Sequence, residues 1–247
     1  MNNDLEIAKF IAAINTLVEE HGIRITYEND FHAFKKTRAA IRQDPYFPAF
    51  DPDQSDLDNN NAIWLHGTFG GKTVQLQAMR LLNIENSLAE HFKEEIGDYA
   101  LPDGEVDLEK SVVDQAPISQ EIRGRVCYHG EFWLAPEYRG SGLTGIMPRM
   151  MLLLGHLAWR PDYIFGLQGM KHSYRGLGIK EGYVHTDMRG VCWQFHDGTF
   201  LNEALVWMTH KDLIYLLRHA PEEVFSEIES LKIPARKGKV AKLIHSR

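Results

Sequence analysis

Apolar residues recur along this chain with two different spacings, which together predict a mixture of helices and strands. Leu5, Phe10, Ile14 and Val18 repeat at helical spacing, so the chain is expected to begin with an amphipathic helix that ends near Gly22. Further on, alternating apolar and polar residues predict short strands separated by helical stretches. In chain order, the elements expected after the first helix are a strand at 23–27, a helix from 29 or 30 to 43, strands at 62–69 and 74–82, a helix at 84–96, a strand at 125–134, a helix ending near 159, a strand at 163–167, a short helix near 174, a hairpin at 191–195 and 200–208, and helices starting near 209 and 221.

This order of elements predicts an α/β fold with a central mixed sheet, mostly antiparallel, and helices on both faces. Residues 1–60 are expected to form an N-terminal helical extension and an acidic loop that pack on a main domain at 61–210. Residues 211–247 are expected to form C-terminal helices and a basic tail. The loop is predicted because residues 44–61 contain three prolines and five aspartates, which interrupt both spacings.

The composition is that of a globular protein with a substantial core, because the chain has 247 residues of which 44% are apolar. Its net charge of -7 argues against a general nucleic-acid binder, although residues 232–247 hold six Lys or Arg and no acidic residue. The longest apolar uncharged run, Met150 to Trp159, is too short to span a bilayer. We therefore expect a cytoplasmic protein with no membrane or nucleic-acid partner.

No metal site is expected from the sequence. Cys127 and Cys192 lie far apart in apolar stretches without a CxxC motif, which indicates reduced core residues. Residues 51–55 begin like a calcium loop, but Asp56 stands where that loop needs glycine and Ala62 where it needs glutamate.

A glycine-rich turn follows the predicted strand at 125–134 and leads into an apolar helix. Residues 139–145 read Arg-Gly-Ser-Gly-Leu-Thr-Gly. Glycines let the backbone approach a ligand closely, and successive amide hydrogens at the start of a helix form a partly positive cradle for phosphate oxygens. Arg139 can add a full charge at the rim of such a cradle. The pattern predicts a pyrophosphate-binding loop.

Two motifs in this region resemble those of the GNAT superfamily of N-acetyltransferases. Arg139, Gly142 and Thr144 occupy the positions where that family has Arg or Gln, then Gly, then Gly or Ala. Residues 174–179, Tyr-Arg-Gly-Leu-Gly-Ile, resemble its later motif of Tyr, two residues, Leu, Gly and an apolar residue. The motifs occur in the family's order and cover about the central quarter of the chain. The resemblance implies a GNAT-like α/β fold and an acyl-CoA-dependent N-acyltransferase, with acetyl-CoA as its donor substrate.

The resemblance also implies roles for particular residues. Backbone amides of the strand before the turn would bind the thioester carbonyl as fixed dipoles, and Tyr174 would protonate the departing coenzyme A thiolate. The residues implied to bind the donor are Phe132, Trp133, Leu134, Arg139, Gly140, Ser141, Gly142, Leu143 and Thr144.

A general base is needed as well, since a free alkylamine has a pKa of about 10 and reaches the site mostly protonated. Glu131 on the predicted strand is the favoured candidate, and His129, with the same strand parity, is its rival. His66 on an earlier strand is a weaker candidate.

The expected reaction is transfer of an acetyl group to a small-molecule or peptide amine by direct attack in a ternary complex. The acidic aromatic loop at 44–58 is a candidate cover for a cationic acceptor. The alternative function is a non-catalytic acyl-CoA-binding sensor or assembly module with the same fold. Relatives that transfer an aminoacyl group from tRNA would need a basic groove, which the composition does not indicate. The first helix offers a docking surface for a homodimer.

Overall fold

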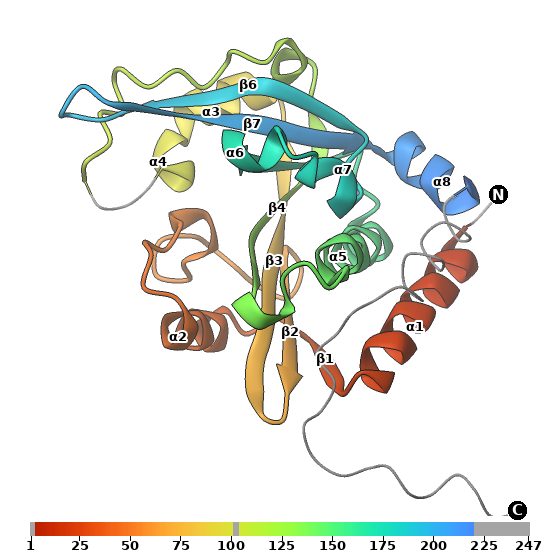
Figure 1. Ribbon diagram of the computed structural model, residues 1–247. Helices are drawn as coiled ribbons and strands as arrows, with labels where there is room; N and C mark the ends of the chain where they lie inside the picture. Colours follow the sequence, from red (N-terminus) through yellow and green to blue (C-terminus); the bar gives the residue numbers. More distant parts are fainter. Residues whose placement is uncertain (1–2, 101–103, 220–247) are drawn as a thin grey trace, which may run out of the picture.

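Seven strands form one sheet in the computed structural model of the protein, which describes residues 3–100 and 104–219 (Figure 1). The strand order is β1-β2-β3-β4-β5-β7-β6, and every neighbouring pair is antiparallel except β4 and β5, which are parallel. The predicted mixed, mostly antiparallel sheet is therefore confirmed. The strands are β1 (Ile23–Glu28), β2 (Ala62–Phe69), β3 (Lys72–Ile84), β4 (Gly124–Leu134), β5 (Tyr163–Gly169), β6 (His185–Gln194) and β7 (Phe200–Thr209).

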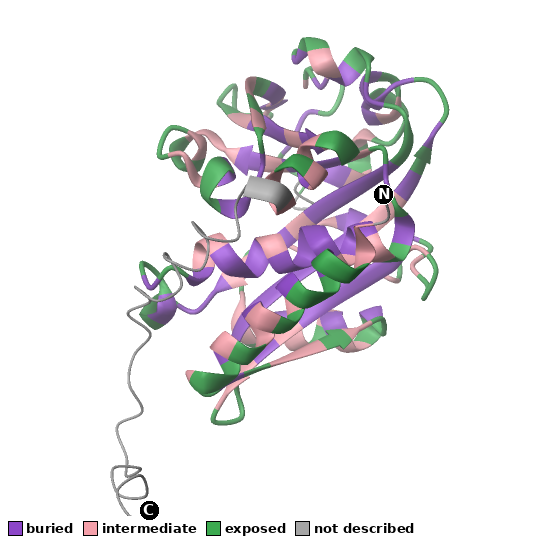
Figure 2. Ribbon diagram, turned by 90° about the vertical axis from the view of Figure 1, so that its right-hand side faces the viewer, coloured by how far each residue is buried: buried purple, intermediate pink, exposed green. Residues whose placement is uncertain are grey.

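Helices cover both faces of the sheet, as predicted, and each face has its own apolar core. On one face, α5 (Leu143–Trp159) is largely buried beneath α1 (Asp4–Glu20), whose outward side is exposed (Figure 2). The opposite face is covered by α2 (Phe31–Ile41), α3 (Leu88–Glu94) and α4 (Ile96–Tyr99). The remaining helices are α6 (Met170–Ser173), α7 (Leu177–Glu181) and α8 (His210–His219).

Most predicted element boundaries agree with the structure to within a few residues, but two do not. The helix expected from Ile84 begins at Leu88, because β3 continues through Ile84 and the Ser87 hydroxyl caps the new helix by accepting from the Glu90 amide at 3.2 Å. The strand expected from residue 191 begins at His185.

The ends of the chain join the sheet in different ways. β1 pairs antiparallel with β2, so the N-terminal extension contributes the edge strand of the main sheet. α8 begins near residue 209, as predicted, with a capping box in which the Thr209 hydroxyl accepts from the Asp212 amide at 3.1 Å and the Asp212 carboxylate accepts from the Thr209 amide at 2.8 Å. The helix expected near residue 221 and the basic tail lie outside the described residues. In the part of the chain that the structure describes, no helix is long and apolar enough to cross a membrane.

Candidate functional site

A β-bulge in β4 forms one wall of the site. In the register of β3 and β4, two residues of β4, Glu131 and Phe132, stand opposite Gln77 alone. Glu131 has a φ of 55°, in the left-handed region that residues other than glycine seldom adopt. A Cβ atom on the preceding Gly130 would lie 2.6 Å from the ring of Phe50, so only glycine fits beside this bulge.

The bulge sends Glu131 and His129 to opposite faces of the sheet. Glu131 contacts Arg38 on α2, whereas His129 bonds Gln77, which in turn donates to a carbonyl of α5. Equal strand parity predicted that the two side chains would point the same way, and this prediction is wrong because the inserted residue reverses the alternation.

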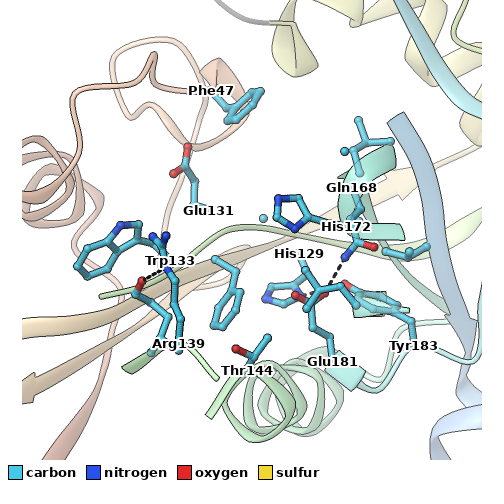
Figure 3. A pocket seen from close by; sticks show the side chains of 18 of the residues that line it. Phe47, His129, Glu131, Trp133, Arg139, Thr144, Gln168, His172, Glu181 and Tyr183 are labelled. Carbon is cyan, nitrogen blue, oxygen red and sulfur yellow. Dashed lines mark hydrogen bonds between the residues drawn. The ribbon is translucent and has the colours of Figure 1, made fainter. Parts of the chain in front are cut away.

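A cavity opens where β4 and β5 separate. The two strands pair only over Val126–Tyr128 and Tyr163–Phe165, and beyond that point they diverge. The cavity between them has a volume of about 500 Å³. Figure 3 shows Glu131 and Phe47 at one end and Gln168, Glu181 and Tyr183 at the other. Of the residues predicted to bind the donor, Phe132, Trp133, Leu134, Arg139 and Thr144 line this cavity, whereas Gly140, Ser141, Gly142 and Leu143 lie in the turn between them.

The glycine-rich turn leads directly into α5. Gly140 and Gly142 have φ values of 76° and 92°, so both adopt the left-handed conformation that glycine permits, and Gly142 is the N-cap of α5. A Cβ atom on Gly140 would meet nothing within 4 Å, which leaves the turn open on that side. The Arg139 Nε donates to the Leu134 carbonyl at 3.0 Å, which fixes the start of the turn against the end of β4.

Pro148 does not interrupt α5, which runs unbroken from Leu143 to Trp159. The free backbone amides of a helix are those of its first turn. Pro148 lacks an amide hydrogen, but it lies beyond that turn. The amides that could contact a phosphate are therefore unaffected by the proline.

His129 is buried and uses both of its ring nitrogens. Its Nδ1 lies 2.9 Å from the Tyr183 hydroxyl, and its Nε2 lies 3.0 Å from the Gln77 Oε1. Burial lowers the pKa of His129 to about 4, so the ring is neutral at pH 7. A neutral, fully bonded imidazole is a poor acceptor for a proton from an amine.

Glu131 is also buried, but it is ion-paired. Its Oε2 accepts from the Arg38 Nε at 2.8 Å and from the Arg42 Nη1 at 2.7 Å, and both arginines also bind Asp44. Its Oε1 is buried and has no hydrogen-bond partner in the described structure. Glu131 lines the cavity, but its side chain is fully buried, so a bound molecule would contact this oxygen only if the side chain or the groups that cover it moved.

The acidic loop contributes to the cavity through an aromatic residue rather than through its aspartates. Phe47 lines the cavity. Asp51 and Asp53 instead bind Lys35, at 2.7 Å each. That the loop covers and selects a cationic acceptor therefore stays a prediction.

Tyr174 and Glu181 are placed differently from what their sequence contexts suggest. Tyr174, the predicted acid, lies at the end of α6 with a relative exposure of 76% and is not among the residues that line the cavity. Glu181, which the sequence reasoning missed, is 6% exposed and does line it. In the sequence, Glu181 stands between Lys180 and Gly182, a context that predicts a solvated helix end. The one signal that could have indicated its burial is Gly182, since a glycine suits a helix C-cap that turns the chain inward.

The two cysteines are free thiols, as expected. Cys127 is buried in the core, where burial raises the pKa of its thiol, and Cys192 is only half-buried. His66, the weaker base candidate, bonds the Thr73 hydroxyl at 2.9 Å and does not line the cavity.

No protein-family model and no curated protein matches the chain. Similar solved structures include Arabidopsis thaliana NAA60 in complex with acetyl-CoA, with a TM-score of 0.44 and 11% identity over 76% of this chain and 98% of that one. An acetyltransferase of the GNAT family from Streptococcus pneumoniae has a TM-score of 0.41 and 12% identity, with 76% and 98% of the two chains covered. The CoA-dependent acyl-homoserine lactone synthase BjaI, solved with MTA, has a TM-score of 0.42 and 12% identity, with 86% and 92% covered.

The TM-scores of these similarities are below 0.5 and the identities are low, so they assign no function to this chain.

Proposed function

We propose that this protein is an acyl-CoA-dependent N-acyltransferase that transfers an acetyl group from acetyl-CoA to an amine by direct attack. The observation that carries the proposal is the separation of β4 from the parallel β5, which opens a cavity running from the glycine-rich turn to buried proton-carrying groups. A long, narrow thioester donor suits such a cavity, because its pyrophosphate and its thioester must be held at two separate points.

The turn supplies the phosphate end of the proposed donor site. The open side of Gly140 and the N-terminus of the 17-residue helix α5 offer amide hydrogens and a partial positive charge to an anion. Arg139 and Thr144 line the cavity at the same place. The backbone of residues 132–134, past the bulge and beyond the pairing with β5, is the proposed site for the thioester carbonyl.

The acceptor is proposed to enter at the other end, beside Glu131, Arg42 and Phe47. The unpartnered Glu131 Oε1 would accept a hydrogen bond from the amine and orient it for attack once the fully buried side chain turns toward the cavity. We favour Glu131 over His129 as the base, because both His129 nitrogens are bonded and its pKa is about 4. To take up a proton, Glu131 would have to weaken its bonds to the two arginines.

The donor site is tested by calorimetric titration with acetyl-CoA. Thr144→Trp should weaken binding by about tenfold or more, since it fills the cavity beside the turn at a position with ordinary helical φ. Thr37→Trp is the matched control, because Thr37 is a half-buried threonine on α2 that does not line the cavity. If the folded parent does not bind acetyl-CoA, the proposal is wrong.

Acetyl transfer itself is tested next, by assaying turnover with a panel of small and peptide amines. Turnover with any of them supports the transferase. Binding of acetyl-CoA without turnover across the panel would favour the sensor, an alternative that gains weight from the exposed position of Tyr174.

A further inference from the structure

Glu181 is turned into the cavity by the way α7 ends. The Gly182 amide donates to the Ile179 carbonyl at 3.1 Å and the Tyr183 amide to the Gly178 carbonyl at 2.9 Å, which is the pattern of a Schellman cap. Gly182 has the left-handed φ of 103° that this cap requires. The cap brings the two side chains on either side of Gly182, Glu181 and Tyr183, to the wall of the cavity.

The Glu181 carboxyl has no cationic partner among the residues that the structure describes. Its Oε2 accepts from the Gln168 Nε2 at 3.2 Å, and the other end of the Gln168 amide accepts from the Ser173 hydroxyl at 2.9 Å. Burial without a compensating charge raises the pKa of Glu181 to about 8, so the carboxyl is mostly protonated at neutral pH. Glu131 shares the cavity but is held by two arginines, so the two carboxyl groups have opposite electrostatic surroundings.

The Tyr183 hydroxyl, the other proton-carrying group at this wall, donates its hydrogen to His129 and not into the cavity. The Gln77 Nε2 donates to the Met147 carbonyl at 2.8 Å, so its Oε1 faces His129 and must accept from the Nε2 of that ring. The His129 Nδ1 therefore carries no proton, and the Tyr183 hydroxyl donates to it. With the Tyr183 proton engaged, Glu181 is the carboxylic acid left to donate into this end of the cavity.

We propose that Glu181 is the general acid that protonates the departing thiolate of the acyl donor. The inference rests on the proposed function, and it deepens that function by assigning to Glu181 the proton that the family resemblance assigns to Tyr174. Glu181 lines the same cavity as residues 132–134, whose backbone is proposed to bind the thioester carbonyl next to the departing sulfur (Figure 3). Glu131 lies at the acceptor end.

The step balances without a further reactant. The amine nitrogen bonds to the thioester carbon, and the carbon–sulfur bond breaks with its electron pair moving to sulfur. Glu181 gives its proton to that sulfur, while the nitrogen loses a proton to the base at the acceptor end. The products are an amide and free coenzyme A thiol, and the Glu181 carboxylate then regains a proton from solvent. A thiol with a pKa near the 8.5 of a free cysteine is well matched to an acid of about 8.

Of the three buried cavity groups Glu181, His129 and Tyr183, only Glu181 should contribute to the pH dependence of this step. Burial lowers the pKa of His129 to about 4 and raises that of Tyr183 well above its ordinary value, so neither titrates between pH 6.5 and 9. The other charged or titratable groups around α7 are His172 on α6, Arg149 on α5, and His185 and Asp187 on β6. Arg149 packs on Gly182, His185 bonds Asp212 and Asp187 bonds Trp207.

The test compares Glu181→Gln with Glu203→Gln, a matched control. Glu203 is a half-buried residue whose carboxyl also has a pKa raised by desolvation, but it bonds Trp193 and does not line the cavity. Tyr174→Phe is the third variant. Glu181→Gln should lower kcat by about 10²–10⁴-fold while the Kd for acetyl-CoA stays within about threefold of the parent. The other two variants should turn over like the parent.

Two readouts separate an acid from a structural residue. With an alkylamine acceptor, the rate of the parent should stop rising above about pH 8, as Glu181 loses its proton, whereas the slower rate of Glu181→Gln should rise on toward the pKa of the amine. A bound donor should exclude water from the Glu181 carboxyl and raise its pKa further. Titration of acetyl-CoA at pH 8 in buffers of different ionisation enthalpy should therefore show proton uptake by the parent and by Glu203→Gln, but not by Glu181→Gln.

Each result has one meaning for the proposal. Equal turnover, or the same proton uptake and pH profile in parent and Glu181→Gln, would show that Glu181 is not the acid while leaving the transferase intact. Loss of turnover in Tyr174→Phe with Glu181→Gln unaffected would return the role to Tyr174. A parent that binds acetyl-CoA without any turnover would overturn the acid role and the transferase together.

Discussion

At the scale of single residues, the site is ordered by a chain of hydrogen bonds with one direction. The Tyr183 hydroxyl donates to the His129 Nδ1, the His129 Nε2 donates to the Gln77 Oε1, and the Gln77 Nε2 donates to the Met147 carbonyl of α5. Each buried donor therefore has one acceptor, and each acceptor one donor. These hydrogen bonds join β3, β4 and α5 to Tyr183 in the turn after α7.

Removing the first donor should cost stability. Tyr183→Phe leaves the buried His129 Nδ1 without a partner, so we expect the free energy of unfolding to fall by about 1–3 kcal/mol in urea titrations. Tyr174→Phe removes the same hydroxyl from a side chain that is 76% exposed, and its effect should lie within about 0.5 kcal/mol. Equal effects in the two variants would mean that the His129 contact contributes nothing.

At the scale of elements, the pair of α2 and β4 depends on buried charge. Arg38, with a side chain only 3% exposed, and Arg42 both reach the fully buried Glu131 carboxylate. The same carboxylate belongs to the bulge that forms one wall of the cavity. The position of α2 over the acceptor end is thus coupled to the shape of β4.

Breaking this network should be far more costly than breaking a surface pair. Glu131→Ala leaves two guanidinium groups without their shared carboxylate, and we expect a loss of about 3–5 kcal/mol in denaturant unfolding. Asp53→Ala removes an exposed partner of Lys35 and should cost less than about 1 kcal/mol. A small effect of Glu131→Ala would show that water replaces the carboxylate readily and that the network does not hold α2.

The sequence predicts elements better than it predicts their irregularities. The apolar runs at 126–128 and 132–134 identify β4, but they do not show where one residue is inserted relative to β3, so the bulge and the reversed direction of Glu131 could not be anticipated. The early start of β6 was missed because it is an edge strand, with irregular pairing between Asp187 and Val191, and its polar residues need not alternate. Glu181 was missed because helix periodicity says nothing about the turn that follows a helix.

At the scale of the whole molecule, three buried groups give stability a pH dependence of known sign. Burial lowers the pKa values of His129 and His156 to about 4, so in acid the unfolded chain binds protons that the folded one does not, and stability falls as pH drops below 6.5. Glu181 acts in the opposite sense. Its folded pKa of about 8 exceeds its unfolded value of 4.5, so its contribution is fully present below pH 4.5 and is lost as pH rises toward 8.

Between pH 6.5 and 8 both histidines are neutral in the folded state, while the unfolded chain loses the rest of their protons, an effect of opposite sign that is the same in the parent and in Glu181→Gln. At Glu181 the folded chain retains a proton that the unfolded chain has lost, so its contribution should lower the free energy of unfolding by about 1.4 kcal/mol per pH unit, on the order of 2 kcal/mol in all, relative to Glu181→Gln. Urea titrations at the two pH values should show this fall in the parent and in Tyr174→Phe, and a smaller one in Glu181→Gln. An undiminished fall in Glu181→Gln would mean that Glu181 is ionised in the folded protein. That result would remove the proton on which its proposed catalytic role depends, whether or not an acceptor amine had been found.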